Sequence, residues 1–139
     1  MTWLVAYAAV AVIFLVLDAI WLGFVARDFY ADQLGDLMRD KPDFGVAGLF
    51  YLVYAAGIVL FAVQPGLQAQ SWRLSLGYGA ALGFLAYGTY DMTNLATIRG
   101  WPVTMAVVDI AWGTAVTALT AGGAVWILRA AGVGQTTGG

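Results

Sequence analysis

Four long apolar stretches constrain the fold of this chain more than any other feature. They cover about residues 2–26, 45–64, 74–98 and 102–128, and short polar segments separate them. Each stretch has at least the roughly 20 residues that a helix needs to cross a bilayer about 30 Å thick. Backbone groups in hydrocarbon must be paired within the segment, which helices achieve and open strands do not. We therefore predict an all-α membrane protein, a four-helix transmembrane bundle with short hairpins.

The composition excludes several classes of protein. Hydrophobic residues make up 62% of the chain and charged residues only 10%, whereas about a quarter of the residues in a soluble domain are charged. The net charge is −2 and the basic residues form no cluster, which argues against a nucleic-acid partner. The chain has no Cys, His or Glu, so disulfides, zinc sites of the His/Cys kind and a Ser-His-Asp triad are excluded.

Turn residues set the limits of the stretches. Pro65-Gly66 is expected to end the second stretch and Arg99-Gly100 the third, and Pro102 suits the first turn of the next helix. The Gly/Thr/Gln composition of 132–139 predicts a flexible tail. The sequence thus predicts a single transmembrane domain over 1–131, followed by that tail.

The segment 27–44, between the first two stretches, holds most of the charged residues of the chain. Its apolar side chains recur at helical spacing and its acids recur every four positions on another face, a pattern that predicts a short amphipathic helix at the membrane interface. A solvated connector with a wet acidic face is the favoured interpretation, and a cation patch is the alternative. The apolar positions are Tyr30, Leu34, Leu37 and Met38, and the acids are Asp28, Asp32, Asp36 and Asp40.

Three aspartates lie inside the apolar stretches: Asp18, Asp91 and Asp109. A carboxylate in hydrocarbon is expensive, so an ionisable residue at that depth indicates a functional site. Each lies about seven or eight residues from the end of its stretch, which is roughly 10–12 Å below an interface at 1.5 Å per residue. Because successive spans alternate in direction, we expect all three in the same half of the membrane.

Aromatic and amide side chains accompany these acids. On the third stretch, four polar residues follow i, i+3, i+4, i+7 spacing and form one stripe along the helix. On the first and fourth stretches an Asp is followed three residues later by a Trp, so that the two side chains project together. We predict one buried ligand or proton site, with its catalytic roles unassigned, that contains Asp18, Asp91, Asp109, Asn94, Tyr87, Tyr90, Tyr51, Tyr54, Trp21 and Trp112.

Charge restricts the chemistry of such a site. Three carboxylates close together in a low dielectric cannot all be ionised without compensation, and no Lys or Arg lies within the core of a stretch. Protons or a bound cation must compensate them. No cofactor motif is present, so a site without a metal is the first expectation. The alternative is a hard cation, Mg²⁺ or Ca²⁺, held by oxygens of Asp18, Asp91 and Asp109.

Six runs between residues 17 and 113 carry a family resemblance that extends over about residues 3 to 125. They are Leu17-Asp18-Ala-Ile-Trp21-Leu22, Phe29-Tyr30, Phe50-Tyr51-Leu52, Tyr87-Gly-Thr-Tyr90-Asp91-Met-Thr93-Asn94-Leu95-Ala96-Thr97, Trp101-Pro102 and Asp109-Ile-Ala-Trp112-Gly113. Together they resemble a bacterial family of small membrane proteins, domain of unknown function 2177, and the Tyr-Asp-x-Thr-Asn-x-Ala-Thr run is the most specific. The resemblance implies a multi-pass protein of the bacterial inner (cytoplasmic) membrane with about four helices, and it implies no activity.

Three hypotheses about function follow. The leading one is a small integral membrane protein whose acidic and aromatic pocket binds and transports a small molecule, cation or proton. The second is an intramembrane enzyme that acts on a lipid or isoprenoid, with one Asp as acid and another as base. The third is an accessory subunit whose acids only lock helix packing. The expected partners are the bilayer and a small-molecule or lipid ligand, and the spacing Gly79-x-x-x-Gly83 indicates close helix packing within the bundle or in a homodimer.

Overall fold

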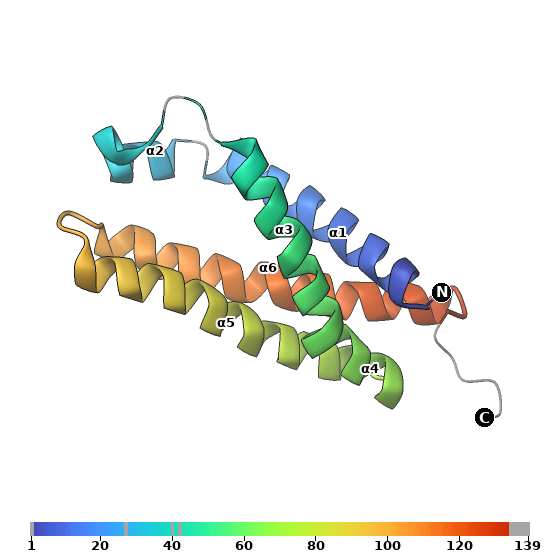
Figure 1. Cartoon of the computed structure of the whole chain (residues 1–139). Coiled ribbons are helices and arrows are strands. Elements are labelled where there is room, and N and C mark those ends of the chain that lie inside the picture. The colour runs from blue at the N-terminus through green and yellow to red at the C-terminus, as the bar shows by residue number, and fades with distance from the viewer. Residues whose placement is uncertain (1, 27, 40, 42, 134–139) are drawn as a thin grey trace.

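The computed structural model describes residues 2–26, 28–39, 41 and 43–133, and all regular secondary structure among them is helical. Figure 1 shows the long helices packed along one another, with the short helix α2 at one end. Two of the long helices contain a π-helical turn. In chain order the elements are α1 (Thr2–Ile20), η1 (Trp21–Val25), α2 (Phe29–Leu34), η2 (Gly35–Leu37), α3 (Phe44–Ile58), η3 (Val59–Val63), α4 (Gln64–Ala69), α5 (Trp72–Thr97) and α6 (Val103–Ala130).

Among the described residues, three helical segments are long and apolar enough to cross a membrane: Thr2–Val25, Phe44–Ala69 and Val103–Ala130. α5 is comparably long at 26 residues, but its Gly, Tyr, Thr and Asn residues make it less apolar than the other three. The all-helical class predicted from the sequence is confirmed.

α5 and α6 form the most extensive helix pair. Gly79 and Gly83 of α5 lie directly against α6. A β-carbon on Gly79 would come within 2.7 Å of the Thr117 carbonyl oxygen, and one on Gly83 would overlap the Gly113 carbonyl. Small residues at this spacing let two helix backbones approach closely, so the Gly79-x-x-x-Gly83 spacing packs α5 on α6 within the chain.

The core lies where α1, the α3–η3 rod and α6 meet. Large apolar side chains such as Leu4, Phe24 and Leu49 are exposed on the outer faces, which is the arrangement expected when lipid surrounds the helices. The fully buried apolar residues of the core include Ala6, Val10, Ile58, Ala62, Val63, Val116, Ala121, Ala124 and Val125.

The prediction that the second apolar helix ends at Pro65-Gly66 is wrong. The helix runs on through the π-helical turn Val59–Val63 and α4 to Ala69, so Pro65 lies within a continuous helix. The missing N–H of this proline removes one backbone hydrogen bond there but does not end the helix. Gly66 leaves room for Ser75, whose hydroxyl donates to the Ala62 carbonyl at 2.6 Å.

The connector between the first two long helices is also less helical than predicted. α2 covers only Phe29–Leu34, and Gly35, with a φ of 55°, ends it before a single 3₁₀ turn. Asp36 therefore does not continue the helix face of Asp32, and Asp40 lies outside the described residues.

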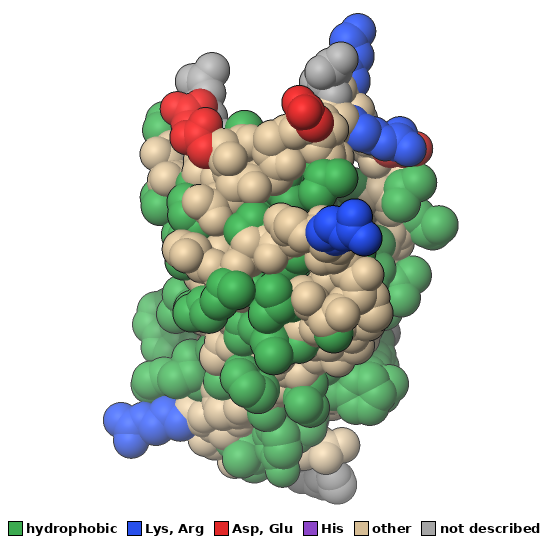
Figure 2. All heavy atoms as spheres, turned by 90° about the vertical axis from the view of Figure 1, so that its left-hand side faces the viewer, with side chains coloured by type: hydrophobic (Ala, Val, Ile, Leu, Met, Phe, Trp, Pro, Cys, Tyr) green, Lys and Arg blue, Asp and Glu red, His purple; other side chains and the backbone are tan. Residues whose placement is uncertain are grey.

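One end of the molecule gathers the segments that carry the aspartates. The end of α1, the start of α3, the end of α5 and the start of α6 all lie on the left of Figure 1, beside α2. Viewed from that end, Figure 2 shows carboxylate side chains at the top, and Lys or Arg side chains at the upper right, on the face below the top and at the lower left. The alternating helix directions thus bring the three apolar-segment aspartates into one part of the bundle.

Candidate functional site

Asp18 joins three helices. Its side chain is buried on α1, where Oδ2 accepts a hydrogen bond from the Tyr51 hydroxyl of α3 at 2.7 Å. Oδ1 accepts a second from Trp112 Nε1 of α6 at 3.2 Å. Both carboxylate oxygens are therefore satisfied, and the bonds fix the positions of an aromatic side chain on each neighbouring helix.

A hydrogen-bonded chain leads from the end of α1 to Asp109. The Trp21 and Trp112 rings stack with centroids 4.5 Å apart and planes 6° from parallel. Trp21 Nε1 donates to the Tyr30 hydroxyl at 3.1 Å, and this hydroxyl donates to Asp109 Oδ1 at 2.8 Å. Trp21 also begins the π-helical turn of η1, and such turns occur often at functional sites.

Tyr30 belongs to this chain although the sequence placed it only on the apolar face of the connector. Burial raises the pKa of its hydroxyl above the ordinary value; the Trp21 N–H opposes this rise and the Asp109 carboxylate adds to it. The hydroxyl therefore stays protonated and donates to Asp109. Its hydroxyl could have identified Tyr30 from the sequence, because a tyrosine on the apolar face of an interfacial helix needs a hydrogen-bond partner.

Asp91 is the exceptional carboxylate. Its side chain is 0% exposed, and neither oxygen has a hydrogen-bond partner among the described residues. The polar side chains beside it are Asp109 and Trp101, and Trp101 Nε1 is likewise buried and unpartnered in this part of the chain. Buried polar groups are nearly always hydrogen-bonded, and a proton shared between the adjacent carboxyl groups of Asp91 and Asp109 would supply such a bond.

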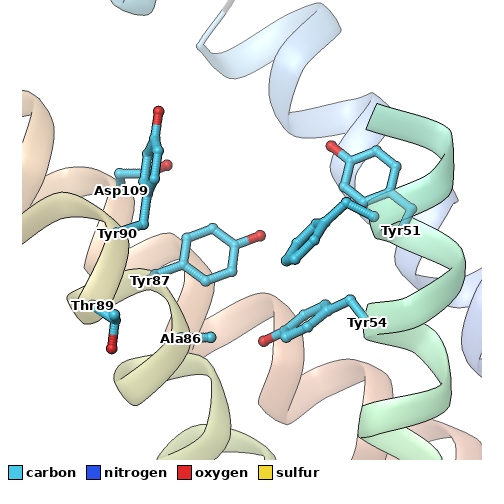
Figure 3. Close-up of a pocket in the computed structure, with 8 residues that line it drawn as sticks. Tyr51, Tyr54, Ala86, Tyr87, Thr89, Tyr90 and Asp109 are labelled. Atoms are coloured by element: carbon cyan, nitrogen blue, oxygen red, sulfur yellow. The ribbon is translucent and has the colours of Figure 1, made fainter. Parts of the chain in front are cut away.

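A cavity of about 570 Å³ opens beside the acid pair, between α3 and α5. Figure 3 shows Tyr87 reaching from α5 into the space that Tyr51 and Tyr54 face from α3. The Tyr54 hydroxyl lies 2.9 Å from Thr117 Oγ1 of α6, which holds this ring against the opposite helix. The lining residues are Phe50, Tyr51, Tyr54, Ala86, Tyr87, Thr89, Tyr90 and Asp109.

The cavity wall is aromatic and negatively charged. Phe50 stacks on Tyr54 with centroids 5.7 Å apart, and Tyr54 meets Tyr87 edge-on at 6.3 Å. Asp109 contributes a carboxylate, and no Lys or Arg is among the described residues that line the space. Aromatic faces and a carboxylate both attract positive charge, so the electrostatics of the wall favour a cation.

The structure divides the ten residues predicted from the sequence into groups. Tyr51, Tyr54, Tyr87, Tyr90 and Asp109 line the cavity. Asp18, Trp21 and Trp112 support it through hydrogen bonds and ring stacking. Asp91 lies next to Asp109, and the partly buried Asn94 makes no side-chain hydrogen bond among the described residues. Sequence reasoning did not identify Tyr30, Phe50, Ala86, Thr89, Trp101 and Thr117.

The three aspartates are not gathered into one group in this arrangement. Among the described residues, no group of three or more acidic side chains lies close enough to hold a metal ion. Asp18 is instead satisfied by Tyr51 and Trp112. The Asp91–Asp109 pair is the part of the predicted cluster that comes together.

Comparison with known proteins identifies the family. Residues 3–126 match the model of the family described as "Predicted membrane protein (DUF2177)". The match covers most of the chain, so the protein belongs to this family and is a membrane protein, as the resemblance implied. No curated protein and no solved structure matches the chain.

Proposed function

We propose that this member of the DUF2177 family is a four-span protein of the bacterial inner membrane that binds a small organic cation in one half of the bilayer, as a step in its transport. α5 serves as the fourth span: its 26 residues extend about 39 Å at 1.5 Å per residue, which exceeds a hydrocarbon core of about 30 Å. Its polar side chains are the reason for its lower hydropathy, and several of them line the cavity. α2 lies at the interface above the site.

The observation that carries the proposal is the bare carboxylate of Asp91 beside Asp109, next to the aromatic cavity. Burying an uncompensated charge costs several kcal/mol. A proton compensates the pair when the site is empty, and the positive charge of the ligand does so when it is occupied. A site of this kind binds cations in preference to neutral molecules of the same shape.

The size and lining of the cavity support an organic rather than an inorganic cation. About 570 Å³ falls within the range of small-molecule sites, roughly 300–1,000 Å³. Four tyrosines and a phenylalanine offer ring faces to an alkylammonium group. A small metal ion would contact only a few of them.

Equilibrium dialysis of the purified protein against benzyltrimethylammonium tests the proposal. We expect binding by the wild-type protein, and affinity reduced by about tenfold, or about 1.4 kcal/mol, in Asp109→Asn. Asp32→Asn is the matched control, because Asp32 is an exposed acid on α2 and its substitution changes the net charge equally. This control should bind like the wild type.

Two results would overturn the proposal. One is the absence of benzyltrimethylammonium binding by the folded wild-type protein. The other is an equal loss of affinity in Asp32→Asn and Asp109→Asn, because this would show that only the overall charge attracts the cation.

A second candidate function is favoured by the asymmetry of the acid pair. Asp109 accepts a hydrogen bond from Tyr30, whereas Asp91 has no partner among the described residues. Two carboxyl groups in different environments can act as acid and base, here on a lipid or isoprenoid. Mass spectrometry of a bacterial lipid extract incubated with the protein should then reveal a product that Asp91→Asn does not form, and an unchanged lipid profile would count against an enzyme.

A further inference from the structure

The cavity opens towards the side of the bundle. Phe50 of α3 and Tyr90 of α5 line it and are 58% and 55% exposed. α5 packs on η3 and α4, and Figure 1 shows α3 and α5 diverging from that contact towards the end that carries the aspartates. The outer faces of α3 also carry exposed apolar side chains such as Leu49 and Val53. In a membrane the mouth therefore faces hydrocarbon rather than water.

A second groove lies on the other side of α5, against α6. It measures about 570 Å³, and it is lined by Phe84, Leu85, Gly88, Thr89, Met92, Val107 and Ile110. Thr89 is the one residue with a polar side chain among them. This surface suits a hydrocarbon chain and offers nothing to a charged group.

Thr89 belongs to both spaces. Its hydroxyl donates to the Leu85 carbonyl of its own helix at 2.6 Å, so it is already paired. Figure 3 shows this hydroxyl turned away from Tyr87 and Asp109. A chain that leaves the cavity across Thr89 thus meets no unsatisfied polar atom before it reaches the groove.

We infer that the ligand is a single-chain amphiphile, whose cationic head binds beside Asp109 and whose hydrocarbon chain crosses Thr89 into the groove between α5 and α6. This inference rests on the proposed function, since it assigns the head to the same cavity. Thr89 borders both spaces, so a chain that leaves the cavity past this residue reaches the groove, and we assign the groove to the chain of that ligand. Entry is lateral, from the bilayer.

A dodecyltrimethylammonium probe with a diazirine in the middle of its chain tests the inference in lipid nanodiscs. After illumination, mass spectrometry of the digested protein locates the labelled residues. We expect labels on residues 84–92 and 107–110, and we expect excess benzyltrimethylammonium to suppress them because it occupies the head site.

Two glycines of α5 provide the matched variants. A β-carbon at Gly88 or at Gly77 meets nothing within 4 Å, so neither substitution should disturb the fold. Gly88→Phe fills the groove and should lower labelling by about tenfold, as expected when a bulky side chain occupies a ligand's space. Gly77→Phe, which is outside the groove, should leave labelling unchanged.

The outcomes separate the inference from the proposed function. Two results would overturn the inference that the ligand is an amphiphile and leave the proposed cation site intact. In one, benzyltrimethylammonium binds but does not suppress labelling; in the other, labels spread evenly over α1 and α6. Equal labelling of Gly88→Phe and Gly77→Phe would also overturn it. If benzyltrimethylammonium itself does not bind, both proposals fail.

Discussion

Asp18 and Asp91 are both buried, yet their surroundings give them different tasks. Asp18 has one hydrogen-bond donor for each oxygen, from two different helices. Asp91 has none among the described residues. A fully bonded carboxylate stabilises the fold, whereas an unpaired one costs free energy and is retained where function needs it. Substitution of Asp18 should therefore lower the stability of the protein, whereas substitution of Asp91 should not.

Asp18→Asn should destabilise the protein. The Trp112 N–H can still donate to the amide oxygen, and the Tyr51 hydroxyl must turn to accept from the amide nitrogen. Two charge-assisted hydrogen bonds thus become weaker neutral ones, at a cost of about 1–2 kcal/mol. Heat unfolding in detergent measures this loss, and benzyltrimethylammonium binding should persist. Tyr51→Phe removes the same contact, so the double variant should be little worse than either single one. A loss of binding at unchanged stability would contradict this assignment.

Asp91→Asn should leave the stability of the protein equal or raise it, because the amide carries no charge and can donate to Asp109. Affinity for benzyltrimethylammonium should nevertheless fall by about tenfold. Unfolding and dialysis on the same preparation measure the two effects. A clear drop in stability would show that Asp91 is a structural residue.

The sequence predicted these residues unevenly, for physical reasons. The cost of a carboxylate in hydrocarbon marks Asp18, Asp91 and Asp109 without any structure. Which of them is paired depends on side chains from other helices, and helical spacing does not reveal those. Tyr30 and Trp101 come from connecting segments whose path the apolar pattern leaves undetermined.

The contact between α5 and α6 depends on glycines, whose importance for packing a hydropathy profile does not reveal. A β-carbon on Gly83 would overlap the Gly113 carbonyl and the Thr117 side chain, and backbone atoms cannot move away cheaply. Gly83→Ala should therefore destabilise the protein by about 1–3 kcal/mol, as measured by unfolding in detergent. Gly77→Ala, on the same helix in open space, should be neutral or slightly stabilising. Equal stability of the two variants would rule out tight packing at Gly83.

The long helices were predictable because apolar length alone specifies them, and their ends differ from the expected limits by a few residues. Pro65 was wrongly predicted to end the second apolar helix. Pro65 lies within a helix that continues from α3 through a π-helical turn to Ala69, and no apolar periodicity marks such a turn. Likewise, the regular acids of 27–44 predicted a longer helix than Gly35 allows.

At the level of the whole bundle, the site depends on α5 crossing the membrane in the opposite direction to α6. α5 is the least apolar of the long helices. Asp91 is buried in the interior of the protein, and the hydroxyls of Thr89 and Thr97 bond to carbonyls of their own helix, so these polar groups are accommodated in a membrane. The alternative is that α5 lies on the membrane surface, which would leave its outer face, including Phe84, Leu85 and Met92, half in water. The two arrangements place the ends of α5 differently.

Single cysteines distinguish these arrangements cleanly, because the chain has none of its own. Arg73 and Arg99 are exposed near opposite ends of α5. A membrane-impermeant maleimide should label Arg73→Cys in only one of two vesicle preparations, inverted or right-side-out. It should label Arg99→Cys only in the other preparation. Asp36→Cys should be labelled in the same vesicle preparation as Arg99→Cys, because α2 and the end of α5 lie at the same end of the bundle. Labelling of Arg73→Cys and Arg99→Cys from the same side would show that α5 does not cross the membrane. The cavity wall that Tyr87 and Tyr90 provide would then not lie within the bilayer.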